Sequence, residues 1–336
     1  CPVPPPMPRI PMRRQPILFR PIYRSRVWGG RNLETVLGRD LSSTDGPIGE
    51  SWDISDRDDA QSIVAGGEWE GLSLNQLWIE KREEIFGAGL LPHPARRFPL
   101  LMKILDACDD LSIQVHPPAR VAAKRGGEPK NEMWYVAHAE PGAKLYIGVK
   151  EGVTRSTFEE AIRTGTTADA VNVIEAQKGD FIYIPSGRLH AIGKGLIIFE
   201  VQQNSDTTYR VFDWNRKGLD GRPRDLHIEE SLESIDFDDR AVRSASRDQE
   251  GRLVSCEDFE VSLRSGSPDI NPVTLGTFGS NLSIAVIDGS LCMGDLSLTA
   301  GDYGLIPACL LPEERQADAS AKTSWLEIRI PPTTAQ

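Results

Sequence analysis

Short apolar runs recur along most of this chain, and glycine, proline or aspartate residues separate them. The clearest runs are three to eight residues long and occupy 98–105, 111–115, 134–136, 145–149, 181–184 and 196–202. Such runs are too short for ordinary helices but have the usual length of β-strands. Many short strands between turn residues are typical of β-sandwiches and β-barrels. The pattern therefore predicts a mainly β fold.

Three segments predict helices instead. Between 72 and 86 the apolar residues recur close to the 3.6-residue period of a helix: Leu74, Leu77, Trp78 and Ile85. Ser73 precedes them and is a suitable N-cap. Shorter helices are expected at 155–163 and 119–125. The region around 72–96 is therefore predicted to be a small helical insertion.

A short internal repeat predicts two copies of one β-barrel unit. Gly179-Asp180 is followed after four residues by Pro185, and Gly301-Asp302 is followed at the same spacing by Pro307. Each copy reads as a turn, a short apolar strand and a second turn. In the second copy Ala308 and Cys309 follow the proline and no histidine does, so that copy is expected to bind no metal.

Composition suggests where the two units begin and end. Residues 1–11 include six prolines and are predicted to be a disordered leader. The charged stretch 236–250 is predicted to be a linker. We therefore expect a catalytic domain at 12–250 and a second, metal-free domain at 251–336.

The overall charge limits the partners that this chain can have. The net charge is −11, which disfavours binding to nucleic acid, because phosphate backbones need a basic surface. No apolar run approaches the ~20 residues of a membrane span, and the N-terminus lacks a signal-peptide core. The five cysteines form no C-x-x-C pair, which argues against disulfides and a thiolate metal site. We expect a cytoplasmic monomer or weak homo-oligomer.

Three segments carry candidate metal ligands. In GDFIYIPSGRLH (179–190), two turns flank a strand and direct His190 inward. Gln114 and His116 are two residues apart, so on a strand their side chains share one face. Glu132 opens another strand. Two imidazoles, a carboxylate and an amide oxygen suit Zn²⁺, although two histidines and a carboxylate also suit Fe²⁺ in oxygenases.

Two further segments place polar side chains beside these ligands. Glu200 begins a polar stretch that includes Asp206 and Arg210, and so dense a polar cluster indicates a site rather than a solvated loop. Lys103 lies within an apolar strand and shares a face with Leu101 and Leu105. A lysine there is costly unless it is paired or functional.

Together these segments resemble the short bacterial type I phosphomannose isomerases, which belong to the cupin superfamily. The matching segments are GESWDIS (49–55), FPLLMKILDA (98–107), QVHP (114–117), KNEMWY (130–135), GDFIYIPSGRLHAIG (179–193) and EVQQNSDTTYRVFDWNR (200–216). They follow the family's order from Val27-Trp28-Gly29-Gly30 to Arg216. The combination is specific, whereas each segment alone is not.

The resemblance implies a fold, a reaction and a set of site residues. It implies two cupin-like, jelly-roll β-barrels and the interconversion of mannose 6-phosphate and fructose 6-phosphate. It also implies zinc at four ligands: Gln114, His116, Glu132 and His190. The implied active-site lining is Glu50, Lys103, Lys130, Glu200, Asp206 and Arg210, with Arg210 in the family's catalytic arginine position. Gln-x-His on the first metal strand, where other cupins carry His-x-His, agrees with the isomerase branch.

An aldose–ketose isomerisation moves a proton between C1 and C2 of an open-chain sugar through an enediol. We expect Glu200 to act as the base and Asp206 to relay the proton. Arg210, Lys103 and Lys130 would stabilise negative charge on the sugar oxygens, and Glu50 would bind substrate. Two alternatives remain open: an Fe²⁺-dependent cupin oxygenase, and a sugar-binding cupin without catalytic activity.

Overall fold

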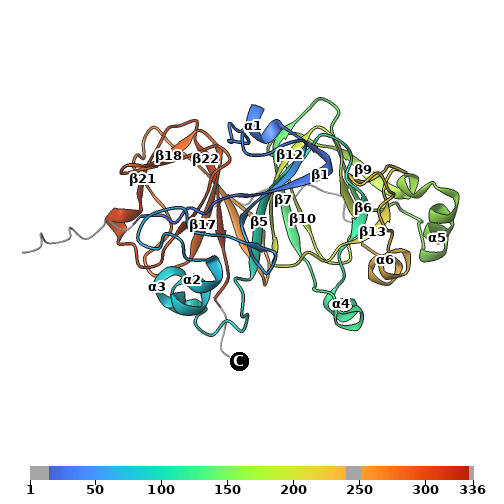
Figure 1. Cartoon of the computed structure of the whole chain (residues 1–336), viewed down its shortest axis with the longest axis horizontal. Helices are drawn as coiled ribbons and strands as arrows, with labels where there is room; N and C mark the ends of the chain where they lie inside the picture. The colour runs from blue at the N-terminus through green and yellow to red at the C-terminus, as the bar shows by residue number, and fades with distance from the viewer. Residues whose placement is uncertain (1–14, 240–250, 333–336) are drawn as a thin grey trace, which may run out of the picture.

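The computed structural model describes residues 15–239 and 251–332, and these form two β-rich halves that lie side by side (Figure 1). The prediction of a mainly β fold is confirmed. The predicted leader, 1–11, and most of the predicted linker, 236–250, lie outside the described residues. The boundary between the two predicted domains stays a prediction.

The first half consists of two facing antiparallel sheets. One has six strands in the order β1 (Ile22–Gly30), β2 (Ile48–Ile54), β5 (Leu100–Ala107), β12 (Leu196–Gln203), β7 (Glu132–Ala139) and β10 (Phe181–Ile184). The other has five strands in the order β13 (Tyr209–Phe212), β6 (Ile113–Val115), β11 (His190–Ile192), β8 (Lys144–Val149) and β9 (Val171–Glu175). An apolar cluster that includes Leu105, Trp134 and Ile147 fills part of the space between them.

The second half repeats this two-sheet arrangement. Its five-stranded sheet has the order β14 (Arg252–Ser255), β15 (Glu260–Ser265), β22 (Ser324–Arg329), β17 (Leu282–Asp288) and β20 (Tyr303–Ile306). Its four-stranded sheet has the order β16 (Val273–Thr274), β21 (Gln316–Ala319), β18 (Ser290–Met293) and β19 (Leu296–Thr299). Apolar side chains such as Ile284, Leu291 and Trp325 fill the space between these sheets.

The two halves share a large apolar core. Alternate residues of β5, β7 and β12, among them Met102 and Phe199, join one buried cluster with Phe259, Leu326 and Ile328 of the second half. The central strands are therefore buried on both faces. This explains why their sequences are almost continuously apolar and do not alternate. Their other face carries three of the polar side chains that the sequence analysis singled out, Lys103, Glu132 and Glu200.

The internal repeat is confirmed by its hydrogen bonds. Gly179 and Gly301 both have φ of +96°, a conformation that glycine adopts without steric cost. The Gly179 N–H donates to Val136 O and the Gly301 N–H to Val286 O, each at 2.8 Å. The strand that follows pairs with β7 in one half and with β17 in the other. The two copies therefore make the same turn-and-strand unit.

The predicted helix at 72–86 is wrong as a single element. Ser73 does cap a helix, α2 (Leu74–Glu80), and it forms a capping box with Gln76. The helix then breaks at Lys81, and α3 (Arg82–Phe86) follows. At the break the Arg82 Nε donates to Trp78 O, the acceptor that its backbone N–H would use in a continuous helix.

The other predicted helices are confirmed as α4 (Ala119–Arg125) and α5 (Arg155–Thr164). The remaining short elements are α1 (Asn32–Thr35), β3 (Asp56–Arg57), β4 (Ala60–Gln61), η1 (Ala88–Leu90), η2 (Thr167–Ala170), α6 (Ile228–Ser234) and η3 (Pro312–Arg315). Phe158 of α5 and Leu232 of α6 cover the outer face of the five-stranded sheet of the first half. Within the described ranges, no helix has the length and apolarity needed to cross a membrane.

Candidate metal centre and active site

Three side chains from different strands converge inside the first half. His116 follows β6, Glu132 opens β7 and His190 opens β11. His116 Nε2 lies 3.3 Å from Glu132 Oε2, and His190 Nε2 lies 3.4 Å from Glu132 Oε1. The ligand atoms of all three residues lie within 4.8 Å of one another. A tetrahedral zinc with bonds of about 2.0–2.1 Å places its ligand atoms about 3.3 Å apart, so this spacing suits a metal ion.

Backbone carbonyls orient both imidazoles. His116 Nδ1 lies 2.9 Å from Thr207 O, and His190 Nδ1 lies 2.8 Å from Arg188 O. A carbonyl oxygen can only accept, so each Nδ1 carries the hydrogen and each Nε2 offers a lone pair toward Glu132. Metal-binding histidines are oriented by such contacts.

The cluster is buried, and several of its atoms have no hydrogen bond. His116, Glu132 and His190 are each 1% exposed. His116 Nε2 and both Glu132 oxygens accept or donate no hydrogen bond within the described parts of the chain. The Lys130 Nζ is 3.0 Å from Glu132 Oε2, a close ion pair without hydrogen-bond geometry. Buried polar atoms are normally paired, so this donor set fits a divalent ion.

The protonation states agree with a ligand role. Burial lowers the pKa of His116 to about 4, and the Lys130 charge acts in the same direction. Burial also lowers the pKa of His190. Burial opposes ionisation of Glu132, but the charge of Lys130, together with the interactions with His116 and His190, outweighs it and holds the pKa of that carboxyl well below its usual range. Near neutral pH the cluster therefore offers two neutral imidazoles and one carboxylate.

Gln114 is the neighbour of this cluster across the sheet. It pairs in register with His190, and its Nε2 lies 3.4 Å from His190 Nε2. Its Oε1 accepts from Ser112 Oγ at 3.2 Å. The Gln114 amide therefore lies at the edge of the cluster, with its nitrogen rather than its oxygen beside His190.

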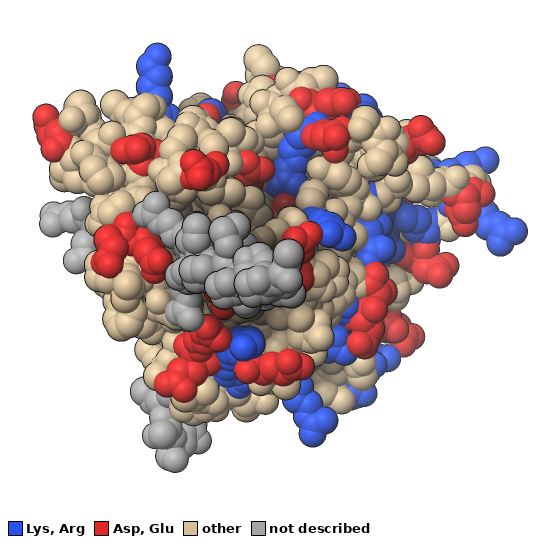
Figure 2. Space-filling model, turned by 60° about the vertical axis from the view of Figure 1, so that its left-hand side comes forward, with Lys and Arg blue, Asp and Glu red and all other residues tan. Residues whose placement is uncertain are grey.

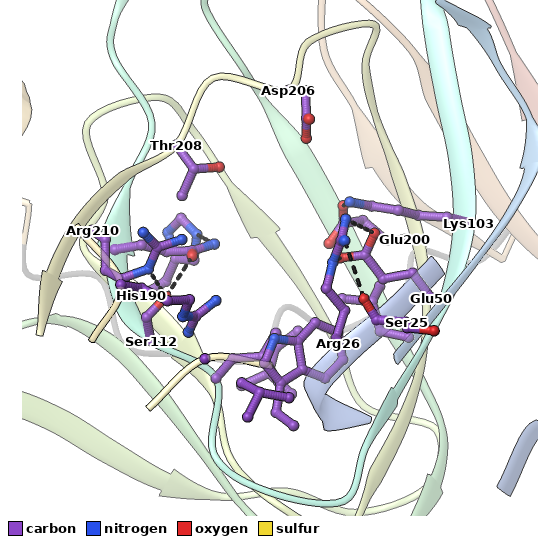
Figure 3. Close-up of a pocket in the computed structure, with 18 of the residues that line it drawn as sticks. Ser25, Arg26, Glu50, Lys103, Ser112, His190, Glu200, Asp206, Thr208 and Arg210 are labelled. Atoms are coloured by element: carbon purple, nitrogen blue, oxygen red, sulfur yellow. Dashed lines mark hydrogen bonds and ion pairs between the residues drawn. The ribbon is translucent and has the colours of Figure 1, made fainter. Parts of the chain in front are cut away.

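A pocket of about 570 Å³ opens in front of the cluster. Figure 3 shows its two walls, with Arg210, Ser112 and His190 on one side and Lys103, Glu50 and Glu200 on the other. Asp206 and Thr208 lie at one end of the pocket in this view. The walls come from the two facing sheets of the first half, so the pocket occupies the space between them that apolar residues do not fill.

The wall from the six-stranded sheet carries a network of charged residues. Lys103 Nζ lies 3.0 Å from Glu200 Oε1, and Trp134 Nε1 donates to Glu200 Oε2 at 2.9 Å. Burial acts to lower the pKa of Lys103, but Glu200 and Glu50 outweigh it and raise that pKa above its usual value. Lys103 is therefore a charged lysine inside a buried strand, stabilised by two carboxylates.

Glu50 lies beside this pair. Arg26 binds both of its oxygens, through Nε at 3.2 Å and NH2 at 3.1 Å, and Trp52 Nε1 donates at 2.6 Å. Burial acts to raise the pKa of Glu50, but Lys103 and Arg26 lower it to about 2. Glu50 is thus ionised and held in one orientation.

The opposite wall presents an arginine without a carboxylate partner. Arg210 Nε donates to Ser112 Oγ at 3.3 Å, and its NH1 donates to Asp225 O at 2.9 Å. No described carboxylate lies within ion-pair distance of it. Arg224 lines the same pocket, but it is paired with Asp213. Arg210 therefore offers the pocket a positive charge with which no carboxylate of the described residues forms an ion pair.

Comparison with known proteins identifies the family. The family model "Phosphomannose isomerase type I, catalytic domain" matches residues 17–127. Mannose-6-phosphate isomerase ManA of Bacillus subtilis is 38% identical over 308 residues, which cover 88% of this chain and 94% of the relative. The chain belongs to the type I phosphomannose isomerase family. The mannose-6-phosphate isomerase of Streptococcus mutans is 41% identical over 222 residues, covering 66% of this chain and 68% of the relative.

Solved structures of this family share the fold. The crystal structure of the Bacillus subtilis mannose 6-phosphate isomerase superposes with a TM-score of 0.80 at 31% sequence identity and covers 94% of this chain and 100% of that one. The predicted family, the cupin-type fold and the assignment to a family of isomerases are confirmed. The sheets in each half remain separate hydrogen-bonded layers and do not close into one continuous barrel.

The structure brings the residues predicted for the type I phosphomannose isomerase site together. Those that line the pocket are Glu50, Lys103, Gln114, Lys130, His190, Glu200, Asp206 and Arg210. His116 and Glu132 lie behind it in the buried cluster. Their individual roles in metal binding and catalysis stay predictions.

Some pocket residues were missed by the sequence analysis. Arg26 lines the pocket and holds Glu50, and Ser112 contacts Arg210. Each lies two residues before a residue that the resemblance highlighted, Trp28 or Gln114, and this spacing on a strand could have revealed them. Arg224 reaches the pocket from a loop, and no local pattern marks it.

Proposed function

We propose that this chain is an aldose–ketose isomerase that interconverts mannose 6-phosphate and fructose 6-phosphate with one zinc ion. The observation that carries the proposal is the buried His116, Glu132 and His190 cluster beside a pocket lined by acidic and basic side chains. The names of the relatives from Bacillus subtilis and Streptococcus mutans support the same reaction.

The proposed ligands are His116 Nε2, His190 Nε2, a Glu132 oxygen and Gln114 Oε1. For Gln114 this requires the amide to turn, so that Oε1 replaces Nε2 beside His190. A mannose 6-phosphate isomerase structure with bound zinc and yttrium has the same fold, at 17% identity and a TM-score of 0.70. When bound, zinc supplies a Lewis acid that polarises sugar oxygens and orients the substrate.

Glu200 is the proposed base for the proton transfer between C1 and C2. Its side chain is buried, and Trp134 and Lys103 contact its two oxygens. These contacts fix its orientation, as general-base catalysis requires. Asp206, which is exposed and lines the pocket, is the proposed proton relay between Glu200 and solvent.

Positive side chains would stabilise the charge that develops on the sugar oxygens. Lys130 Nζ lies 3.8 Å from Glu200 Oε1, so it and Lys103 flank the proposed base. Arg210 lies on the wall opposite Lys103 (Figure 3). Because a guanidinium stays charged and binds oxyanions well, Arg210 is the proposed catalytic arginine. Glu50 would accept hydrogen bonds from substrate hydroxyls.

We also propose that the partner is a small phosphorylated sugar, and that the chain is a cytoplasmic monomer or weak homo-oligomer. Figure 2 shows one face of the molecule, on which Lys and Arg side chains lie among Asp and Glu. Such a mixed surface, with a net charge of −11, supports an expectation of no nucleic-acid partner.

The test is a coupled assay that follows conversion of mannose 6-phosphate to fructose 6-phosphate, with and without a chelator. We expect turnover by the zinc-loaded protein, loss of turnover in the chelator, and recovery when zinc is returned. Absence of turnover by protein with a full zinc content would contradict the proposal. Oxygen consumption by the Fe²⁺-loaded protein would favour an oxygenase, and sugar-phosphate binding without turnover would favour a binding protein.

A further inference from the structure

Asn131 lies between two side chains of the proposed site but faces away from them. Lys130 lines the pocket and its Nζ lies 3.0 Å from Glu132 Oε2, whereas the Asn131 side chain contacts Ser186 and Asp258 instead. The Asn131 N–H donates to Gln203 Oε1 at 2.7 Å. Its side-chain Oδ1 accepts from Ser186 N at 2.8 Å and from Ser186 Oγ at 3.1 Å. Hydrogen bonds of Asn131 with Gln203 and Ser186 therefore hold the backbone between Lys130 and Glu132 in place.

The remaining donor of Asn131 binds a carboxylate from the second half. Asp258, in the turn between β14 and β15, accepts from Asn131 Nδ2 through Oδ2 at 2.7 Å. Its other oxygen, Oδ1, accepts from Gln203 Nε2 at 2.8 Å. The Gln203 N–H in turn donates to Asn131 O at 3.0 Å. One carboxylate thus joins the end of β12 to the beginning of β7.

This network extends to both sides of the metal cluster. Ser186 accepts from the Lys130 N–H at 3.1 Å, and it belongs to the 179–190 segment that ends at His190. The network therefore connects the backbone before Glu132 with the segment that carries a second proposed ligand. Hydrogen bonds to a carboxylate are among the stronger ones in proteins, so removing Asp258 would release two amide groups at once.

We infer that Asp258 is a positioning residue of the active site: its carboxylate holds Asn131 and Gln203 and so fixes the backbone from which Lys130 and Glu132 reach the metal and the substrate. The second half, which is predicted to bind no metal, thereby contributes to the geometry of the site without touching the reacting atoms. The inference rests on the proposed function for the roles of Lys130 and Glu132.

The chain offers a matched control for loss of a contact between the halves. Asp288, also in the second half, pairs with Lys178 of the first half at 2.6 Å. That pair lies at a different turn, and no hydrogen bond or ion pair among the described residues joins it to Asn131 or Gln203. Replacing Asp288 by alanine therefore removes a polar contact between the halves and leaves the Asp258 network intact.

The first experiment compares Asp258→Ala with Asp288→Ala. For each folded variant, zinc affinity is measured by competition with a chromophoric chelator, together with kcat and KM for mannose 6-phosphate. We expect Asp258→Ala to weaken zinc binding by roughly tenfold, the scale for residues that orient metal ligands, and to lower kcat. For Asp288→Ala, the zinc affinity and kcat should both stay within twofold of the wild-type values.

A second experiment exchanges donor and acceptor. Asn131→Asp places two carboxylates face to face, and Asp258→Asn removes one of the two acceptors, so both should weaken zinc binding. The double variant keeps every bond: the new amide at 258 donates to the new carboxylate at 131 and still accepts from Gln203. We expect the double variant to bind zinc more tightly than either single variant.

The inference would be overturned if the zinc affinity and kcat of Asp258→Ala were both within twofold of the wild-type values. A double variant no better than its single variants would also overturn it. If Asn131→Asp does not fold, the inference is tested by comparing the zinc affinities of Asp258→Ala, Asp258→Asn and Asp288→Ala. The two proposals can fail separately. If the wild-type protein binds zinc but does not isomerise the sugar, the proposed function is wrong, and the zinc affinities of the variants still test the role of Asp258.

Discussion

The phenol of Tyr303, in the second half, donates a hydrogen bond to the backbone oxygen of Lys103 at 3.3 Å. The Tyr303 ring also stacks on Phe199, with the ring centroids 5.7 Å apart. Phe199 precedes Glu200 on β12, and Lys103 pairs with Glu200. The second half therefore packs directly behind the two strands that carry the proposed base and its lysine.

Removing this hydroxyl should affect stability more than catalysis. Tyr303→Phe keeps the ring and loses one buried hydrogen bond, which is worth about 1 kcal/mol. We expect the free energy of unfolding in urea to fall by about that amount, and kcat/KM to change by less than about threefold, since the Lys103 side chain keeps its carboxylate partners. A drop of about tenfold in kcat/KM with unchanged stability would contradict this expectation.

The metal content should depend on His190. Replacing it by alanine removes one of the two imidazoles whose Nε2 faces Glu132, so the purified variant is expected to lose bound zinc. Elemental analysis after dialysis measures this. His93→Ala is the matched control, because His93 packs on Trp78 and takes no part in the cluster. Full zinc content in His190→Ala would refute its assignment as a ligand.

Arg210 should be needed for turnover rather than for folding. Its guanidinium lines the pocket and donates hydrogen bonds to Ser112 Oγ and Asp225 O. We expect Arg210→Ala to keep the fold by circular dichroism and to lower kcat by roughly 10²-fold or more, the scale of losing one oxyanion donor. The control is Arg163→Ala, which removes an exposed arginine paired with Glu160. Normal kcat with raised KM would limit Arg210 to substrate binding.

Lys103 and Glu200, which form an ion pair, should be coupled in their contributions to the free energy of unfolding. Lys103→Met leaves the buried Glu200 carboxylate with Lys130, at 3.8 Å, as its nearest described cation, so we expect a loss of about 3 kcal/mol in unfolding free energy. Glu200→Gln in the same background removes that unpaired charge and should recover part of the loss. Urea unfolding of both single variants and the double variant gives the coupling energy. Additive effects would show that the pair is not energetically coupled.

Acid should weaken the fold through Glu50. The pKa of Glu50 is about 2 in the folded protein, against about 4.3 for a free glutamate, so its ionisation stabilises the fold above pH ~4.5. That contribution is lost as the pH falls toward 2, and about 1 kcal/mol of it is lost by pH 3.5. Urea unfolding between pH 7 and pH 3.5 should therefore show a shallower pH dependence for Glu50→Gln than for the wild type. Parallel curves would contradict this prediction.

Local patterns in the chain were enough to predict the class of fold, and their combination indicated the family and several of the residues that meet in the pocket. The 179–190 segment predicts an inward-facing His190 because its two turns and its strand are set by neighbouring residues. The Ser73 cap and the repeated Gly-Asp turns are local for the same reason. Such features depend on the backbone preferences of a few consecutive residues, so they can be predicted from the sequence.

Other features were decided only by the tertiary structure. Arg26 reaches Glu50 across a strand pair, the helix that periodicity predicted to be continuous breaks beside Arg82, and Asp258 binds Asn131 from 127 residues away. The Arg82 guanidinium is also held by His93 O and Ala95 O, which lie outside the helix. The Arg26 and Asp258 contacts depend on which strands and turns pack together when the chain folds. That packing is a property of the whole apolar surface, and no short segment encodes it.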